Sequence, residues 1–315
     1  LILRICLKIY DNILFHIQAY NFSCQTLKVL KLKRYNLIVL IAQVSPISAI
    51  LGLFLIVPIV TIMIVSFWDY SEFMLLPDFV WTNYYETLTS FVTYKTYLNT
   101  FKYTILTWFF TLLIGFPVAY FLCFHVRTLR WQIVLFLICT IPFWTSNIIR
   151  MISWIPFLGR NGVFNSILIN LGLINEPLEF LLFSDFAIVL AFVHLYTLFM
   201  VVPIFNSMMR IDRSILEAAI DSGANGWQVL TNIVIPLCKP GIAIGSIFVV
   251  TLVMGDYITV RLMGGGLRAS VGVMMWNEIS LLLYPPAAAN AVLLLIVVLI
   301  LVSLMMRIVD LKKEL

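Results

Sequence analysis

One acidic residue interrupts a long run of apolar residues and could do chemistry there. Asp256 lies within the stretch VTLVMGDYITVRLMGGG. An ionised aspartate near the centre of a membrane helix costs ~2.5–3.5 kcal/mol on insertion scales, so we expect it to have a partner. We predict that its carboxylate faces a transport path and pairs transiently with an ammonium group of a cationic solute. Aromatic rings add cation–π contacts for an alkylammonium, and the candidates are Tyr257, Trp144 and Trp154.

A structural role for Asp256 is the alternative. The carboxylate could pair with Arg261, Arg150 or a base of another subunit, or it could cap a helix beside a break at Gly255. The sequence leaves these alternatives open.

A second functional pattern lies in a polar segment between two apolar runs, MMRIDRSILEAAIDSGANGWQVLTNIVIPLCKPG. We expect a helix that begins near Ile215, a turn at Gly223, and a second helix over about 226–233. Pro236 and Pro240 are expected to end the second helix. A helix, a glycine turn and a second helix held against a membrane are typical of a docking surface.

The first of these helices carries two very small side chains. Ala218 and Ala219 present almost no bulk, so another protein surface can approach that helix closely. The residues around them follow the spacing EAA-x3-G-x9-I-x-LP, with Ile235 where Leu is usual. The positions that match are Glu217, Ala218, Ala219, Gly223, Ile233 and Pro236. This chain therefore resembles the permease subunits of ABC importers.

The composition places the chain in a membrane. Hydrophobic residues make up 62% and charged residues 11%, whereas a soluble domain has about 25% charged residues. A membrane helix needs about 20 mostly apolar residues, and six runs qualify: 37–67, 97–124, 131–157, 186–209, 241–262 and 287–309. We expect an all-α membrane protein with about six transmembrane helices. The segment 159–185 is predicted to be a loop with a short helix.

The distribution of Lys and Arg predicts the orientation. Of the 20 such residues, six fall on one side of the predicted spans or its flanks, namely Lys95, Lys102, Arg150, Arg160, Arg261 and Arg268. The other fourteen fall on the opposite side, which is therefore predicted to be cytoplasmic, together with both termini. We expect an N-terminal cytoplasmic segment 1–36, a permease domain 37–309 with its coupling loop at 210–240, and a cytoplasmic tail 310–315.

Several other patterns bear on assembly and energy supply. Gly241 and Gly245 form a GxxxG pair suited to close helix packing. The sequence contains no GxxxxGK[ST] phosphate-binding loop, so we expect no ATPase activity, with ATP and Mg bound by a partner. The five cysteines form no CxxC pair, and the net charge of +5 is scattered. We expect no metal site, no cofactor and no nucleic acid.

The resemblance extends beyond the loop to the polyamine (spermidine/putrescine) permeases. It is carried by IPFWTSNIIR (141–150), GRNGVFNSILINLGLI (159–174) and LMGGG (262–266). It implies the MetI-like fold of type I importers in the cell inner membrane, and inward polyamine transport by alternating access. The implied partners are two copies of an ATP-binding subunit, which contacts the EAA positions, a second homologous permease and an extracytoplasmic substrate-binding protein.

Two alternatives remain at this point. An ABC permease of the same kind could carry another small solute, such as iron or an inorganic anion. A stand-alone secondary transporter would need no ATPase, but it predicts inverted repeats with broken helices, which the sequence does not show.

Overall fold

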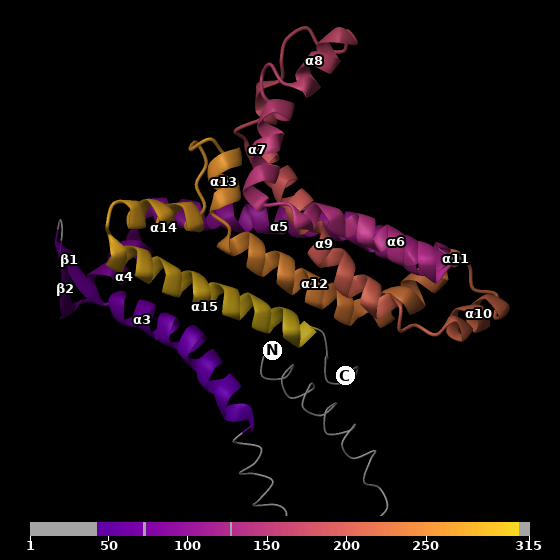
Figure 1. Cartoon of the computed structure of the whole chain (residues 1–315), viewed down its shortest axis with the longest axis horizontal. Coiled ribbons are helices and arrows are strands. Elements are labelled where there is room, and N and C mark those ends of the chain that lie inside the picture. The colour runs from indigo at the N-terminus through magenta and orange to yellow at the C-terminus, as the bar shows by residue number, and fades with distance from the viewer. Residues whose placement is uncertain (1–42, 72–73, 127, 309–315) are drawn as a thin grey trace, which may run out of the picture. The chain divides into compact units, whose positions relative to one another are not determined.

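The computed structural model describes residues 43–71, 74–126 and 128–308. The predicted N-terminal segment 1–36 and the tail 310–315 lie outside these ranges. Contacts divide the chain into two units, Leu1–Thr61 and Ile62–Leu315. The described residues are mostly helical, as the apolar runs predict (Figure 1).

The first predicted span forms the helix Gln43–Val65. A π-helical turn, η1 (Gly52–Ile56), precedes α3 (Val57–Val65). The turn ends two residues before Pro58. Proline has no N–H to donate and its ring collides with the carbonyl four residues earlier, and a widened turn is a common way for a helix to absorb such a defect.

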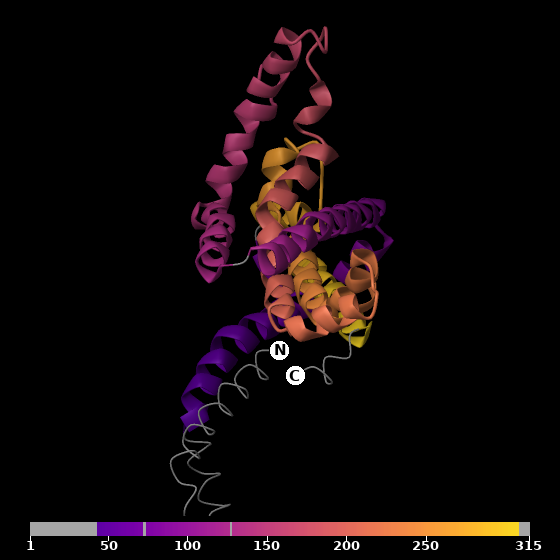
Figure 2. The same ribbon diagram turned by 90° about the vertical axis from the view of Figure 1, so that its right-hand side faces the viewer.

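Three helices form the core of the second unit. They are α5 (Phe91–Tyr120), which continues into η2 (Phe121–His125), α9 (Asp185–Met208) and α12 (Ile235–Gly255), and they pack against one another (Figures 1 and 2). Phe192, Met200 and Ile204 of α9 are completely buried between them.

The GxxxG pair is the place where α12 meets α9. A β-carbon added at Gly241 would lie 2.5 Å from the carbonyl oxygen of Pro203, and one added at Gly245 would lie 2.8 Å from Met200 Sδ. Both distances are too short for a real side chain. The predicted close packing at this pair is confirmed. The two helices in contact, α9 and α12, belong to the same chain.

A second group of elements surrounds the beginning of α15 (Tyr284–Ile308). Strands β1 (Trp68–Ser71) and β2 (Met74–Phe79) pair antiparallel, with Trp68 opposite Phe79 and Asp69 opposite Leu76. The helix α4 (Thr82–Thr89) follows the hairpin. α15 packs against β1, α4, α12 and α14 (Val271–Ser280).

The predicted third span, 131–157, is not one helix. The structure divides it into α6 (Leu129–Thr140), the 3₁₀ turn η3 (Ile141–Trp144) and α7 (Asn147–Leu158). Pro142 removes one backbone donor, and Ser146 takes an extended conformation that starts a new helix. The expected short helix is α8 (Val163–Asn170), and η4 (Glu179–Leu181) follows it. Figures 1 and 2 show α7 and α8 projecting from the α5/α9/α12 bundle.

The predicted fifth span, 241–262, is wrong at both ends. The helix runs from Gly226 to Gly255 as α11 (Gly226–Val229), the π turn η5 (Leu230–Val234) and α12. Pro236 and Pro240 do not end it, because η5 absorbs the first proline two residues before it occurs, as η1 does for Pro58. A separate short helix, α13 (Ile258–Met263), follows the break.

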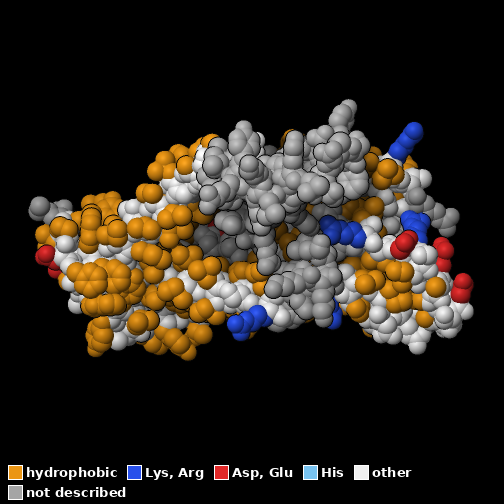
Figure 3. Space-filling model, turned by 90° about the horizontal axis from the view of Figure 1, so that it is seen from below, with side chains coloured by type: hydrophobic (Ala, Val, Ile, Leu, Met, Phe, Trp, Pro, Cys, Tyr) orange, Lys and Arg blue, Asp and Glu red, His pale blue; other side chains and the backbone are white. Residues whose placement is uncertain are grey.

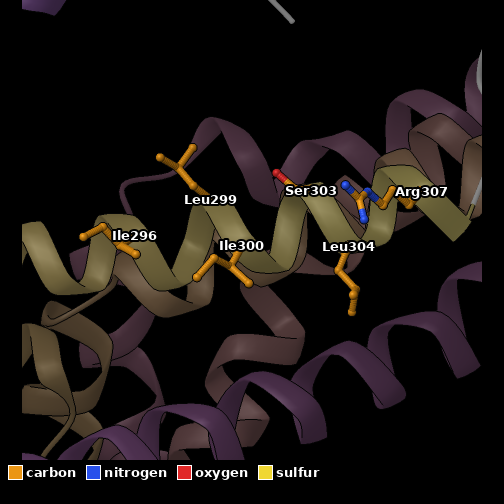
Figure 4. A pocket seen from close by; sticks show the side chains of 6 residues that line it. All are labelled: Ile296, Leu299, Ile300, Ser303, Leu304 and Arg307. Atoms are coloured by element: carbon orange, nitrogen blue, oxygen red, sulfur yellow. The ribbon is translucent and has the colours of Figure 1, made fainter.

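Five helices in the described ranges are long and apolar enough to cross a membrane, against about six predicted. They are Gln43–Val65, Phe91–His125, Asp185–Met208, Gly226–Gly255 and Tyr284–Arg307. Figure 3 shows one face on which most of the described side chains are hydrophobic. A shallow hollow of about 380 Å³ along α15 is lined by Ile296, Leu299, Ile300, Ser303, Leu304 and Arg307 (Figure 4). Its apolar lining suits contact with lipid chains.

Candidate coupling loop and membrane carboxylate

The EAA residues lie on α10 (Arg213–Asp221), between the core helices α9 and α12. The helix closes in a Schellman motif, in which the N–H of Gly223 donates to the carbonyl of Ile220 and the N–H of Ala224 donates to that of Ala219. The motif needs a left-handed residue after the helix, and Gly223 has φ +89°. The expected turn at Gly223 is therefore confirmed, with a conformational reason for glycine.

The second helix of the loop begins with a reciprocal cap. The backbone N–H of Gln228 donates to Asn225 Oδ1 over 2.8 Å, and the backbone N–H of Asn225 donates to Gln228 Oε1 over 2.9 Å. This capping box fixes the direction in which the chain enters α11. Asp212 stands at the N-cap position of α10, but its side chain makes no capping bond.

The loop presents one face to the core and another to solvent. Leu216 and Ala219 pack against the buried cluster of the bundle. Glu217, Ala218 and Gly223 are exposed. Two large apolar side chains beside them are also exposed, Ile220 to 60% and Trp227 to 71%. α10 and α11 lie at one end of the bundle (Figure 1). Their exposed patch of small and apolar side chains is suited to contact with another protein.

Ile233 and Pro236 belong to the helix that leaves this loop. Ile233 lies in η5 and Pro236 in the first turn of α12. The structure therefore joins the EAA positions to a single helical segment of 30 residues, Gly226–Gly255. At 1.5 Å per residue this segment is about 45 Å long.

Asp256 stands at the far end of that segment, just after α12 ends. Its Oδ1 accepts the backbone N–H of Thr259 over 2.9 Å, and its Oδ2 accepts the hydroxyls of Thr259 and Tyr196, each over 2.7 Å. We predicted that Asp256 lies inside a span, and this prediction is wrong. The residue is half-buried at a helix break, and it holds the start of α13 against α9.

The capping alternative thus describes the local geometry of Asp256. Within the described ranges the carboxylate forms no ion pair, so pairing with Arg261 or Arg150 does not occur in this structure. Three hydrogen-bond donors satisfy it instead. Whether the carboxylate also meets a solute remains a prediction.

Tyr257 lies beside Asp256 in a ring stack. Its ring lies parallel to that of Trp276 with centroids 4.8 Å apart, and the guanidinium of Arg261 lies 5.3 Å from the Trp276 centroid. Gly272 lets α14 approach Tyr257 closely, because a β-carbon at Gly272 would lie 3.1 Å from Tyr257 Cβ. Trp276 already covers one face of the Tyr257 ring.

The two predicted tryptophans lie on η3 and α7, in the divided third span. Trp154 of α7 donates its indole N–H to His194 Nδ1 of α9 over 3.0 Å. Trp144 lies on η3 and is 83% exposed. The structure therefore places Tyr257 beside Asp256 and ties Trp154 to another side chain of α9.

Sequence reasoning did not identify the partners of Asp256. Thr259 could have been found, because an aspartate at a helix start commonly accepts the backbone N–H of the residue three positions later. Tyr196 could not, because it lies 60 residues earlier on α9.

The arrangement of helices defines the class of this protein. Its fold matches a chain of the bacterial alginate ABC transporter in complex with alginate pentasaccharide-bound periplasmic protein, with a TM-score of 0.65 and 15% identity, over 88% of this chain and 96% of that one. A second structure, of a bacterial ABC transporter that imports alginate, gives a TM-score of 0.62 at 18% identity, over 86% and 94%. The predicted all-α fold of ABC-importer permeases is confirmed.

Sequence comparison then gives the family. The chain is 31% identical over 232 residues to the spermidine/putrescine transport system permease protein PotB of Haemophilus influenzae, which covers 72% of this chain and 79% of that protein. It is 36% identical over 161 residues to PotB of Escherichia coli K12, over 51% and 58%. No family model matches the chain. The protein belongs to the family of spermidine/putrescine permeases of ABC importers.

Proposed function

We propose that this chain is the membrane-spanning permease subunit of an ATP-driven importer that carries spermidine or putrescine into the cytoplasm. The observation that carries the proposal is the 31% sequence identity to PotB of Haemophilus influenzae over 232 residues. The proposed complex contains two ATP-binding subunits, a second permease and an extracytoplasmic binding protein. It lies in the inner membrane with both termini of this chain in the cytoplasm.

The geometry supports a coupling role for α10 and α11. The exposed surface of Ala218, Ile220 and Gly223 meets the ATP-binding subunit, which holds the ATP and Mg. The capping box and the Schellman motif make this loop rigid, and the helix Gly226–Gly255 is continuous. A movement imposed on the loop is therefore transmitted along this helix to Asp256. The π turn η5 is the one irregular turn within the segment.

The position of Asp256 supports a cationic solute. A carboxylate at a helix break can exchange one of its hydroxyl donors for an ammonium donor without leaving a buried charge unpaired. Tyr257, whose ring stacks on Trp276, lies beside this carboxylate. Alternating access then follows from two arrangements of the break, each of which binds the solute with a different affinity.

Uptake by the reconstituted complex tests this function. The chain, the second permease and the ATP-binding subunit are placed in vesicles with the binding protein, and entry of labelled putrescine is measured with and without ATP. We expect uptake that requires ATP and every subunit, and no ATP hydrolysis by this chain alone. Uptake by this chain without the other subunits, or transport of iron or an inorganic anion in place of the polyamine, would contradict the proposal.

A further inference from the structure

A second carboxylate lies outside the coupling loop and the Asp256 break. Glu278, on α14, is half-buried where α14 meets α15, and no described basic residue pairs with it. In the described ranges the only hydrogen-bond partner of its side chain is Asn290 of α15, whose Nδ2 lies 2.9 Å from Oε1 and 3.1 Å from Oε2.

The hydrogen-bond capacity of this pair is not filled. Asn290 Nδ2 carries two hydrogens, yet it lies within hydrogen-bond distance of three acceptors, the third being the carbonyl of Pro286 at 3.2 Å. At least one of these three acceptors therefore lacks a full donor.

The other end of the same amide lacks a partner altogether. Asn290 is 1% exposed, and its Oδ1 accepts no hydrogen bond from any described residue. A buried acceptor left unpaired costs ~1–3 kcal/mol. Because Oδ1 and Nδ2 share one carbon, the unpaired acceptor lies next to the carboxylate.

The surroundings are anionic and aromatic. β1 and α4, which carry Asp69 and Glu86, both pack against α15. Burial, and then the charges of Glu86, Asp69 and Glu278, raise the pKa of the Tyr70 phenol, so these three carboxylates act on one point. The hydroxyl of Tyr97 on α5 reaches the backbone carbonyl of Asn290 at 3.5 Å.

We infer that Glu278 and Asn290 bind a primary ammonium group. Such a group has three N–H donors and a positive charge, so it can donate to both oxygens of Glu278 and to Asn290 Oδ1 at once. In the described ranges no group of three or more His, Cys, Asp or Glu is placed to hold a metal ion, and the single carboxylate with an amide oxygen suits an organic cation. The inference rests on the proposed function in one respect: the amine it binds is the transported one, held before it reaches Asp256.

Equilibrium binding of labelled putrescine tests this site. The full chain, in nanodiscs of phosphatidylcholine only, is compared with the variants Glu278→Gln and Glu179→Gln. Glu179 is an exposed glutamate on η4 paired with Arg160, and it serves as the matched control for loss of one negative charge. We expect Glu278→Gln to weaken binding by about tenfold or more, since a hydrogen bond to a charged group is strong, and the control to change it by less than about twofold.

A second variant separates the site from a folding defect. Asn290→Leu removes the amide but keeps the size and the helix, and we expect it to weaken putrescine binding while the charge of Glu278 remains. Circular dichroism and gel filtration check that each variant is folded. If Glu278→Gln folds and binds putrescine like the parent chain, the inference is wrong.

The same ammonium chemistry occurs on phosphatidylethanolamine. Nanodiscs that contain this lipid distinguish the two sources: if the lipid displaces putrescine and the displacement is lost in Glu278→Gln, the site belongs to the lipid headgroup and the transported amine is not its ligand. The assembled importer separates this inference from the proposed function. Polyamine uptake with an unchanged KM in Glu278→Gln contradicts the site alone, whereas an importer that carries no polyamine contradicts the function.

Discussion

The hydroxyl of Tyr196 donates to Asp256 Oδ2 over 2.7 Å, and this bond joins the middle of α9 to the break between α12 and α13. Thr259 supplies two further donors to the same carboxylate. Asp256 therefore stands where the long segment from the coupling loop ends, and its side chain anchors that point to the core of the bundle. Its charge and its hydrogen bonds can be tested separately.

Asp256→Asn should reduce transport more than stability. An asparagine keeps one acceptor for the Thr259 N–H, and its amide can donate to hydroxyls that rotate, so we expect the free energy of unfolding to fall by less than about 1 kcal/mol. If the carboxylate meets an ammonium group, kcat/KM for polyamine uptake should fall about tenfold or more. Uptake by the complex and thermal unfolding in detergent measure the two effects.

Tyr196→Phe is the matched control for that experiment. It keeps the charge of Asp256 and removes one hydrogen bond, so we expect a loss of ~1 kcal/mol in stability and uptake within a few-fold of the parent. Equal transport losses in the two variants would assign Asp256 to structure alone.

Gly223→Trp should uncouple ATP hydrolysis from uptake. Nothing lies within 4 Å of a β-carbon added there, so the indole extends from the exposed surface where a partner would sit. We expect normal membrane insertion, weaker association with the ATP-binding subunit, and uptake reduced by about tenfold or more. Pull-down of that subunit and uptake in vesicles are the measurements.

The conformation of Gly223 calls for a separate control. Its φ of +89° penalises any side chain by ~1–2 kcal/mol, whereas Asn tolerates the left-handed region better than other residues. We therefore expect Gly223→Asn to keep most of the coupling. A loss as large as that of the Trp variant would indicate backbone strain rather than a blocked surface.

Local sequence patterns predicted the parts of this fold that depend on local forces. The turn at Gly223, four of the five long helices and the small-residue contact at Gly241 all follow from spacing and residue size. The capping box at Asn225 and Gln228 has a recognisable spacing too.

The errors came from prolines and from distant partners. The helix breaks near Pro142, whereas a π turn absorbs the defect at Pro236. Hydropathy does not distinguish these two outcomes, because each depends on whether the backbone before the proline can widen into a π turn within its packing. In the same way, the unpaired oxygen of Asn290 depends on α14 folding back on α15, which no local pattern reports.

The contact at Gly241 should be intolerant of even one methyl group. Gly241→Ala places a β-carbon against the carbonyl of Pro203, which is backbone and cannot move aside, so we expect the free energy of unfolding to fall by ~1–3 kcal/mol. Gly226 lies at the start of the same helical segment with nothing within 4 Å of an added β-carbon, and Gly226→Ala should be neutral or slightly stabilising. Denaturant titration of the purified chain compares them, and equal stabilities would contradict the packing of α9 against α12.

The binding of an ammonium group at Glu278 should weaken as pH falls. Burial raises the pKa of this carboxyl above its ordinary value, and the amide of Asn290 acts in the opposite direction without cancelling it. The carboxylate is charged above its pKa and neutral below it, while the primary ammonium of putrescine stays protonated throughout. As pH falls, affinity for putrescine should therefore decline at a higher pH than an ordinary glutamate would give. The titratable groups that neighbour this carboxyl are Asp69, Glu86, Tyr70 and Tyr97. Glu278→Gln should bind weakly and lose most of this pH dependence, and a profile in that variant that follows the parent chain would show that another group is responsible.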